Sequence, residues 1–437
     1  MNVGVISLGC VKNRVDTEQM LSILSTAGHT LTDQAEEADV LIVNTCGFIN
    51  VAKEESIDTI LEMAQFKETG KCRLLCVTGC LSQRYGKELR DEIPEADLIV
   101  GVSQYDLLPS LIEKALSGEK ILDTSRRESA PCDGRILTTK PYTAYIRIGE
   151  GCDNRCAYCA IPLIRGNHSS RKADDILKEM ATLAANGARE QILIAQDTTR
   201  YGRDLEGASL QSLIRKAAGV PGVDWLRVLY CYPDETNIPL IDEMAAHDNV
   251  CRYLDLPLQH ASPELLKKMN RRGDMEDIKK LLLYARGKGF ALRTTFIVGF
   301  PGETEEDFEV LMQFTRDMAF DRMGAFAFSP EEDTTAFSMP SQVPEKVKQA
   351  RLDRLMALQS EISLSRNQLR IGTVEKVLVT GHADGYYTGR SAWEAPDADG
   401  IIRIQSDDAL REGTFIMAKV VSADAYDLSA VPFKESK

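Results

Sequence analysis

The sequence predicts an α/β chain in three parts: an N-terminal doubly wound parallel sheet, a central partial (β/α)6 barrel and a small C-terminal all-β barrel. Short apolar runs alternate with helical periodicity over 1–130, as in parallel strands covered on both faces. Strand–helix units continue through 138–368. Closely spaced strands with Gly turns then occupy 369–437, as in small β-barrels. We take these three ranges as the domains.

The N-terminal part contains four apolar runs that we interpret as parallel strands. A helical pattern over 15–28 ends at Gly28, a plausible C-cap. The expected strands are 3–9, 38–46, 73–80 and 97–101. Ligands of such open sheets bind at the carboxyl ends of the strands, so functional residues are expected there.

The central part repeats the strand–helix unit six times. Eight units would close a full barrel, so six predict a partial or open one. The region 341–368 reads as one long polar helix, which we expect to be a connector. The expected strands are 143–149, 191–196, 225–230, 253–259, 292–299 and 323–329.

The C-terminal part alternates four short strands with Gly turns, the pattern of a barrel that often binds oligonucleotides. It carries 11 acidic and 8 basic residues. An RNA-binding barrel should be basic, whereas an acidic one suits a basic protein partner. A generally acidic composition is the alternative explanation. Because every ligand proposed below precedes it, we expect deletion of 370–437 to weaken substrate capture and leave those ligands intact.

Composition excludes several classes of protein. The 437 residues are 43% hydrophobic and 27% charged, ordinary values for a soluble protein, and the net charge is −14. This charge argues against non-specific binding to nucleic acid or anionic membranes, although it leaves room for a local basic groove. The chain shows neither a signal-peptide pattern nor an apolar stretch long enough to cross a membrane. We therefore expect a cytoplasmic protein.

Eleven cysteines in a reducing compartment indicate metal or redox chemistry rather than disulfides. Within EGCDNRCAYC (150–159), Cys152, Cys156 and Cys159 are spaced C-x3-C-x2-C, just after the first barrel strand. Three thiolates can hold a cubane iron–sulfur cluster that a fourth cysteine would complete, so one iron would stay open. A structural zinc site, which favours paired C-x2-C units, and ordinary core packing are the alternatives.

A second cysteine set is spread over the N-terminal part. Cys10, Cys46 and Cys80 each end an expected parallel strand, so the sheet should bring them to one edge. Gly9 and Gly79 precede two of them, as tight turns beside a bulky group require. Three buried cysteines at strand ends are the alternative.

The other five cysteines are interpreted as structural. Cys72 and Cys76 share strand parity with Cys80, but we take them as strand and core residues. Cys132 lies in a linker, and packing is the favoured role for Cys231 and Cys251, which lie in or near barrel strands.

The C-x3-C-x2-C motif at the start of a six-unit β/α barrel resembles the radical S-adenosylmethionine (SAM) enzymes. The resemblance implies that the open iron binds the amino and carboxylate groups of SAM, and that an electron from the cluster splits SAM to a 5′-deoxyadenosyl radical. It places Tyr158 beside the adenine and Gln196 at the amino group. It also places Ile297, in TFIVGFPGE, near the base, although Thr295 stands where the family has a glycine.

The order of the three parts resembles the methylthiotransferases, which replace a C–H hydrogen by a methylthio group and end in a TRAM domain. The resemblance implies two 4Fe-4S clusters and two SAM molecules, one supplying the methyl group and the other the radical. The cluster on Cys10, Cys46 and Cys80 would carry the sulfur. A sulfur carrier and an electron donor are the implied partners.

Six segments resemble the methylthiotransferases that modify the β-carbon of an aspartate on the twelfth small-subunit ribosomal protein. The substrate would then be a basic ribosomal protein, free or within the ribosome. Two alternatives are an enzyme that modifies an adenosine of tRNA and a non-enzymatic iron–sulfur scaffold that binds the ribosome. The segments are SLGCVKNRVDTE, LIAQDTTRYG, LYCYP, YLDLPLQHAS, IVGFPGETEEDF and GRSAWEAPDADG.

The residues that position the aspartate are not identified by the sequence, and none is assigned as catalytic. Arg165 and Arg171, just beyond the cluster loop, could pair with a carboxylate. Gln259 and His260 end the fourth barrel strand. All four stay outside the assigned site.

Overall fold

The computed structural model describes residues 1–127 and 134–434, so Cys132 lies outside the described residues. The chain divides into two compact units. Unit 1 comprises Met1–Lys140, Tyr145–Ser169 and Ser329–Phe337, and unit 2 comprises Pro141–Ala144, Ser170–Phe328 and Ser338–Lys437. The loop with the C-x3-C-x2-C motif therefore belongs to the same unit as the N-terminal sheet.

The N-terminal sheet of unit 1 has six parallel strands in the order β2-β1-β3-β4-β5-β6, which confirms the doubly wound prediction. The order reverses between β1 and β3, where such sheets form their ligand crevice. The short strands β2 and β6 were not predicted. The strands are β1 Asn2–Ser7, β2 Thr30–Thr32, β3 Val40–Thr45, β4 Leu74–Gly79, β5 Leu98–Val100 and β6 Ile121–Asp123.

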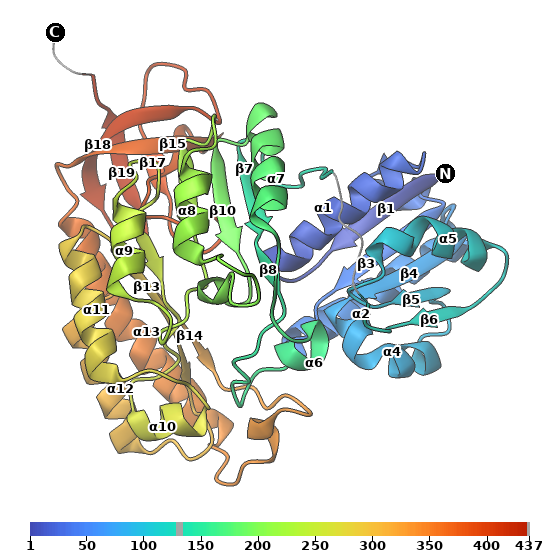
Figure 1. The fold of residues 1–437 in the computed structure, drawn as a ribbon, viewed down its shortest axis with the longest axis horizontal. Helices are drawn as coiled ribbons and strands as arrows, with labels where there is room; N and C mark the ends of the chain where they lie inside the picture. Colours follow the sequence, from blue (N-terminus) through green and yellow to red (C-terminus); the bar gives the residue numbers. More distant parts are fainter. Residues whose placement is uncertain (128–133, 435–437) are drawn as a thin grey trace. The chain divides into compact units, whose positions relative to one another are not determined.

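Helices cover both faces of this sheet (Figure 1) and create two cores. One core packs α1 and α5 on one face, with Met20 and Ile112 among its buried side chains. The other packs α2 and α4 on the opposite face, with Ile60 and Leu89 among its members. The helices are α1 Val11–Thr26, α2 Asn50–Ala64, α3 Phe66–Thr69, α4 Cys80–Glu92 and α5 Leu108–Leu116.

The six strands expected in the central part are all present. They form two three-stranded sheets, β11-β10-β7 and β12-β13-β14, rather than one continuous sheet. Hydrogen bonds from Leu226 N to Asn249 O and from Cys251 N to Leu226 O join the two at β11. The partial barrel is thus confirmed. The strands are β7 Thr143–Arg147, β10 Glu190–Ile194, β11 Trp225–Val228, β12 Tyr253–Asp255, β13 Ala291–Val298 and β14 Arg322–Ala327, with the two-residue strands β8 Gly149–Glu150 and β9 Ser169–Ser170.

The long polar helix α13 does more than connect. It packs on β14 and buries a stripe of mostly polar residues at helical spacing. Gln359 donates to Phe320 O at 2.9 Å, and Arg351 pairs with Glu303 at 3.0 Å, so both buried side chains have partners outside the helix. The helices of this part are α6 Ile161–Arg165, α7 Ala173–Ala185, α8 Leu210–Ala218, α9 Ile238–Ala245, α10 Pro263–Lys268, α11 Met275–Gly287, α12 Glu305–Met318 and α13 Glu345–Gln368.

The C-terminal part is a closed barrel in the order β15-β16-β17-β19-β18, as predicted, with β19 as a fifth strand that was not expected. Alternate residues such as Val377, Val379, Ile402 and Ile404 fill its interior. The strands are β15 Val374–Ala383, β16 Tyr386–Arg390, β17 Ile402–Ile404, β18 Phe415–Ala423 and β19 Leu428–Pro432.

Buried charges join this barrel to the central strands within unit 2. Glu190, at the start of β10, has a fully buried side chain and accepts from Arg390 of β16 at 2.6 Å. The same carboxylate pairs with Arg227 of β11 at 3.3 Å. The Arg227 guanidinium also donates to Ala392 O at 2.9 Å. These contacts meet at the amino-terminal ends of the parallel strands.

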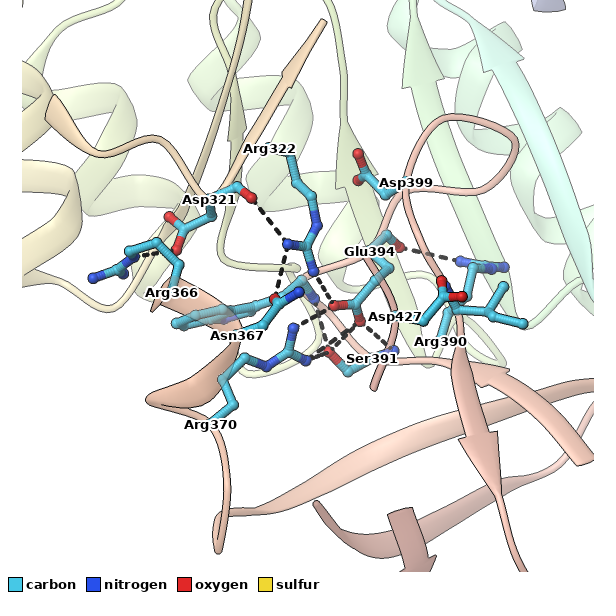
Figure 2. A network of polar contacts seen from close by, with 12 residues as sticks. Asp321, Arg322, Arg366, Asn367, Arg370, Arg390, Ser391, Glu394, Asp399 and Asp427 are labelled. Atoms are coloured by element: carbon cyan, nitrogen blue, oxygen red, sulfur yellow. Dashed lines mark hydrogen bonds and ion pairs between the residues drawn. The ribbon is translucent and has the colours of Figure 1, made fainter. Parts of the chain in front are cut away.

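A second buried carboxylate, that of Glu394, also joins the barrel part to the central strands, as Figure 2 shows. Glu394 pairs with Arg322 of β14 at 2.8 Å and with Arg370, and it accepts from Ser391 Oγ at 2.7 Å. Asp399 accepts from Tyr253 Oη at 2.6 Å. The loop between β16 and β17 thus supplies carboxylates to cations and hydroxyls of the central strands.

The C-terminal barrel is therefore not a separable module. Its removal would take Arg390 away from Glu190 and Glu394 away from Arg322, and loss of one partner of a buried ion pair is strongly destabilising. The expectation that deletion of 370–437 weakens substrate capture and leaves the proposed ligands intact does not fit these contacts.

Candidate functional site

The three N-terminal cysteines stand at the carboxyl ends of neighbouring strands. Cys10 is the N-cap of α1, after β1, Cys46 directly follows β3, and Cys80 is the first residue of α4, after β4. The three thiols interact electrostatically with one another. The parallel sheet therefore brings three residues that are far apart in sequence to one edge.

Their exposure and acidity differ. Cys10 is exposed, Cys46 is half-buried and Cys80 is buried. Burial is the main cause that raises the pKa of Cys46, and it raises the pKa of Cys80 to about 11, although Arg165 acts in the opposite direction.

Glycines make the close approach possible. Gly9 and Gly79 have φ of +84° and +99°, as the expected tight turns require. A Cβ on Gly9 would lie 2.9 Å from Cys46 Cβ, and one on Gly79 would collide with Asn44 and Thr45. Side chains at either position would push the strand ends apart.

The second cysteine set lies in the loop between β8 and α6. Cys152, Cys156 and Cys159 are all half-buried. Hydrogen bonds from Cys152 N to Gly166 O and from Cys159 N to Cys156 O, both 3.0 Å, fold the loop back on itself. Gly151, with φ of +70°, packs so tightly against Asn167 that no side chain would fit. The loop is therefore preformed.

One arginine links the two cysteine sets. Arg165, the last residue of α6, has only 2% of its side chain exposed. Its Nη2 donates to Asn13 Oδ1 at 2.6 Å and lies 3.5 Å from Cys80 Sγ. Ion pairs join it to Asp16 at 2.8 Å and to Glu150 at 3.1 Å. Arg165, which the sequence analysis left outside the assigned site as a residue that could pair with a carboxylate, is thus already paired within the fold.

The segment 329–337 also contacts the elements that carry the two cysteine sets. Glu331 pairs with Lys53 of α2 at 3.0 Å and with Arg84 of α4 at 3.4 Å. Ala336 N donates to Ala157 O, inside the cysteine loop, at 2.8 Å. The segment thus contacts the helices that follow Cys46 and Cys80 as well as the loop.

The residues expected to contact SAM are distributed over both units. Tyr158 is half-buried in the cysteine loop of unit 1. In unit 2, Gln196 follows β10 by two residues and Ile297 is the penultimate residue of β13, both half-buried. These two lie toward the carboxyl ends of their strands, where barrel enzymes place their sites. Their contact with SAM stays a prediction.

The remaining polar candidates have structural partners. Arg171 pairs with Glu179 at 2.7 Å. Gln259, with φ of +73°, joins β12 to β13 through hydrogen bonds of its backbone to Thr295 O and Ile297 N. His260 is fully buried and accepts from Ser262 N at 2.9 Å, and burial lowers its pKa to about 4, so its ring is neutral near pH 7.

The other described cysteines are buried, as expected. Cys76 and Cys72 belong to the cores on opposite faces of the N-terminal sheet. Cys72 precedes β4 rather than lying in it, which corrects the strand assignment. Cys231 and Cys251 are buried beside the barrel strands. None of the ten cysteines within 1–127 and 134–434 forms a disulfide.

Over the same described ranges, no three His, Cys, Asp or Glu side chains already surround a point as metal ligands would. The chemistry of the donors nevertheless fits iron–sulfur clusters, because each set offers three thiols and cubane clusters are held by cysteine thiolates. Ligation by either set is therefore a proposal.

Three family models match the chain in succession. The uncharacterised protein family UPF0004 matches residues 2–101, the radical SAM superfamily 146–315 and the TRAM domain 371–432. These matches fit the three predicted parts. The helices that the structure describes include none that is long and apolar enough to cross a membrane.

Full-length relatives decide the family. A protein of Desulforudis audaxviator is 47% identical over 98% of this chain and 96% of its own length, and one of Pelotomaculum thermopropionicum is 49% identical over 98% of each. Both are named ribosomal protein uS12 methylthiotransferase RimO. This chain belongs to the RimO family. The radical SAM methylthiotransferase assignment is thereby confirmed, and with it SAM and a 4Fe-4S cluster as cofactors of the family.

Solved structures support the fold of this RimO-family chain. The radical SAM methyltransferase TsrM from Kitasatospora setae, with cobalamin and a [4Fe-4S] cluster bound, aligns with a TM-score of 0.58 at 16% identity, over 77% of this chain and 76% of its own. The cobalamin-dependent SAM radical enzyme OxsB aligns with 0.53 at 12% identity, over 83% and 56%. At these identities the likeness concerns the fold alone.

Sequence reasoning missed the polar residues between the cysteine sets. Asn13, Asp16 and Glu331 were not singled out. A signal existed for the first two, since positions three and six residues after Cys10 lie on one face of the helix that follows. Glu331 had none, because its partners Lys53 and Arg84 are more than 240 residues away.

Proposed function

We propose that this chain methylthiolates the β-carbon of an aspartate on ribosomal protein uS12, with one cluster on Cys152, Cys156 and Cys159 and a second on Cys10, Cys46 and Cys80. The observation that carries the proposal is that both cysteine sets belong to one compact unit and are linked through Arg165. The relatives' printed name supports the substrate.

Each part of the site has a role in this proposal. A bound cluster with an open iron would hold SAM and pass on the electron that splits it, and a second SAM would supply the methyl group. Cys152, Cys156 and Cys159 hold the first cluster on a preformed loop. Cys10, Cys46 and Cys80 hold the second, which carries the sulfur. Tyr158, Gln196 and Ile297 orient SAM. A sulfur carrier and an electron donor complete the set of partners.

The proposed domain limits are 1–130 for the N-terminal iron–sulfur domain, 138–368 for the radical SAM core with its linker helix, and 369–437 for the TRAM-like β-barrel. The three family matches fall within them. A ribosomal substrate, free or assembled, would place the chain in the cytoplasm, the location expected from the sequence.

The test compares the mass of uS12 after incubation with the reconstituted chain, SAM, a reductant and a sulfide source. We expect a gain of one methylthio group in place of a hydrogen, and about eight irons per chain. Replacing Cys152, Cys156 and Cys159 by Ala should leave about four irons and no SAM cleavage. Methylthio-nucleosides in tRNA, with unmodified uS12, would favour the tRNA alternative. SAM cleavage by the triple variant would refute the assignment of the barrel cluster.

A further inference from the structure

We propose that Arg165 positions Cys80 and raises the reduction potential of the N-terminal cluster, so that a residue of α6, just after the loop with Cys152, Cys156 and Cys159, controls the sulfur-carrying cluster. The inference rests on the proposed function, because it requires a cluster on Cys10, Cys46 and Cys80. It assigns Arg165 a role toward a metal ligand rather than toward substrate.

The first support is the position of the guanidinium. Arg165 reaches from the end of α6, six residues after Cys159, into the carboxyl edge of the N-terminal sheet. Its Nη2 lies 3.5 Å from Cys80 Sγ, within range for an N–H donor to sulfur. Ala160 and Ile164 of the same segment pack on Cys80, so the segment both covers the sulfur and directs a cation at it.

The second support is the rigidity of that arrangement. Asn13 Oδ1 accepts from Arg165 at 2.6 Å, while Asn13 Nδ2 donates to Thr45 O at 2.9 Å and to Leu8 O at 3.1 Å. The amide is thereby fixed between the ends of β1 and β3. Asp16, fully buried, lies 2.8 Å from the same Nη2. Arg165 cannot swing away without breaking several buried hydrogen bonds.

The third support is the charge balance. Asp16 and Glu150 face Arg165 and Arg147, so two carboxylates offset two guanidinium groups. A cluster with three thiolates adds negative charge to this site. A buried cation and an N–H···S hydrogen bond both stabilise the reduced form, which carries one more electron, and they raise the reduction potential.

Arg147 provides a matched control. It pairs with the same two carboxylates, Asp16 and Glu150, and donates to Gln19 at 2.9 Å. Its replacement tests the loss of a buried cation from the shared network. Arg165 adds the contact with Cys80 that the proposal invokes.

The experiment is a redox titration of the full chain with both clusters, followed by electron paramagnetic resonance. Added SAM alters the signal of the cluster that binds it, so the SAM-insensitive signal reports the N-terminal cluster. Arg165→Gln should shift its reduction equilibrium toward the oxidised form by about tenfold more than Arg147→Gln, which is about 59 mV for a one-electron couple. Arg165→Lys, which keeps the charge, should shift it less.

Iron content separates the outcomes. Equal potentials in Arg165→Gln and Arg147→Gln, with about eight irons retained, would overturn the inference and leave the proposed function standing. If Arg165→Gln loses about four irons and Arg147→Gln does not, Arg165→Lys decides: a lowered potential supports the inference and an unchanged one overturns it. A wild-type chain with a single cluster would defeat both proposals.

Discussion

Two cysteines only four residues apart occupy opposite kinds of environment. Cys76, inside β4, is fully buried among the apolar side chains that face α1 and α5. Cys80, the first residue of α4, lies beside Arg165 and Asn13 and interacts electrostatically with Cys10 and Cys46. Alternate residues of one strand face the same side, which made Cys76 and Cys80 appear equivalent in the sequence. They are not equivalent, because β4 ends at Gly79 and Cys80 already belongs to a helix.

Single replacements should therefore separate these residues. Cys10→Ala, Cys46→Ala and Cys80→Ala should each abolish methylthio transfer and leave SAM cleavage measurable, since the ligands of the SAM cluster are intact. Cys76→Ala, the control, should keep both clusters and lose about 1 kcal/mol of stability. Iron content, SAM cleavage and uS12 mass measure the result. Loss of the second cluster in Cys76→Ala, with Cys80→Ala unaffected, would show that Cys76 is the ligand.

Crowding at Gly79 gives a second test at this scale. Gly79→Ala should destabilise the chain by roughly 1–3 kcal/mol more than Gly118→Ala. Both glycines have φ near +100°, but an added Cβ meets nothing within 4 Å at Gly118 and lies 2.6 Å from Thr45 N at Gly79. Urea unfolding of the cluster-free chains measures the difference. Equal losses of stability in the two variants would mean that position 79 requires glycine for its backbone conformation and not to avoid crowding.

At the scale of elements, carboxylates hold the C-terminal barrel to the central strands. Burial alone would raise the pKa of Glu394, but Arg370 and Arg322 outweigh it, so the pKa lies well below its usual range. The pKa of Glu190 is also lowered, because Arg390 and Arg227 outweigh its burial. Carboxylates with a lowered pKa in the folded state stabilise it at neutral pH and lose this contribution as pH falls.

Glu394→Gln should reveal this dependence. At pH 7 the variant should lose about 3–5 kcal/mol, because Arg322 remains buried without its counter-charge and Arg370 loses Glu394 although it keeps Glu375. Below about pH 5 the difference should shrink, since Glu394 then takes up a proton in the unfolded chain while it stays ionised in the folded one. Denaturant unfolding of the cluster-free chains at several pH values measures it. The exposed Glu361→Gln serves as control, with a change within about 0.5 kcal/mol. A pH-independent difference would contradict the pKa assignment.

At the scale of the whole molecule, the net charge of −14 suits a basic ribosomal protein as substrate. Only some of the acidic residues in the C-terminal barrel can contribute to recognition. Asp397 and Asp407 are exposed, whereas the side chain of Asp399 is 2% exposed and accepts from Tyr253. A charge reversal at Asp399 would test stability rather than binding.

Asp397→Lys combined with Asp407→Lys should weaken binding of uS12, by about 0.2–1 kcal/mol per charge, with a larger effect at low salt. Titration of uS12 and of bulk tRNA, side by side, measures the change. Glu306→Lys with Glu361→Lys alters the net charge equally outside the barrel and serves as control. If the control pair weakens binding as much, the barrel has no special role, and a wild-type preference for tRNA would remove the electrostatic support for a protein substrate.

The sequence by itself determined most of the architecture and both cysteine sets. Apolar runs such as 38–46 and 73–80 predicted strands correctly, because a strand buried on both faces has to be apolar throughout. The spacing of Cys152, Cys156 and Cys159 is local and could be read directly. The three-residue strands β2 and β6 escaped, since such short edge segments carry too little pattern.

Only the tertiary structure decided how charges are paired. From its place beyond the cysteine loop, Arg165 could have paired with any carboxylate, yet the fold buries it against Asp16 and Cys80. The barrel looked separable, yet Glu190 and Arg390, 200 residues apart, form a buried pair. Periodicity reports the burial of apolar side chains along one segment, whereas the partner of a buried charge is set by which distant segments the fold brings together.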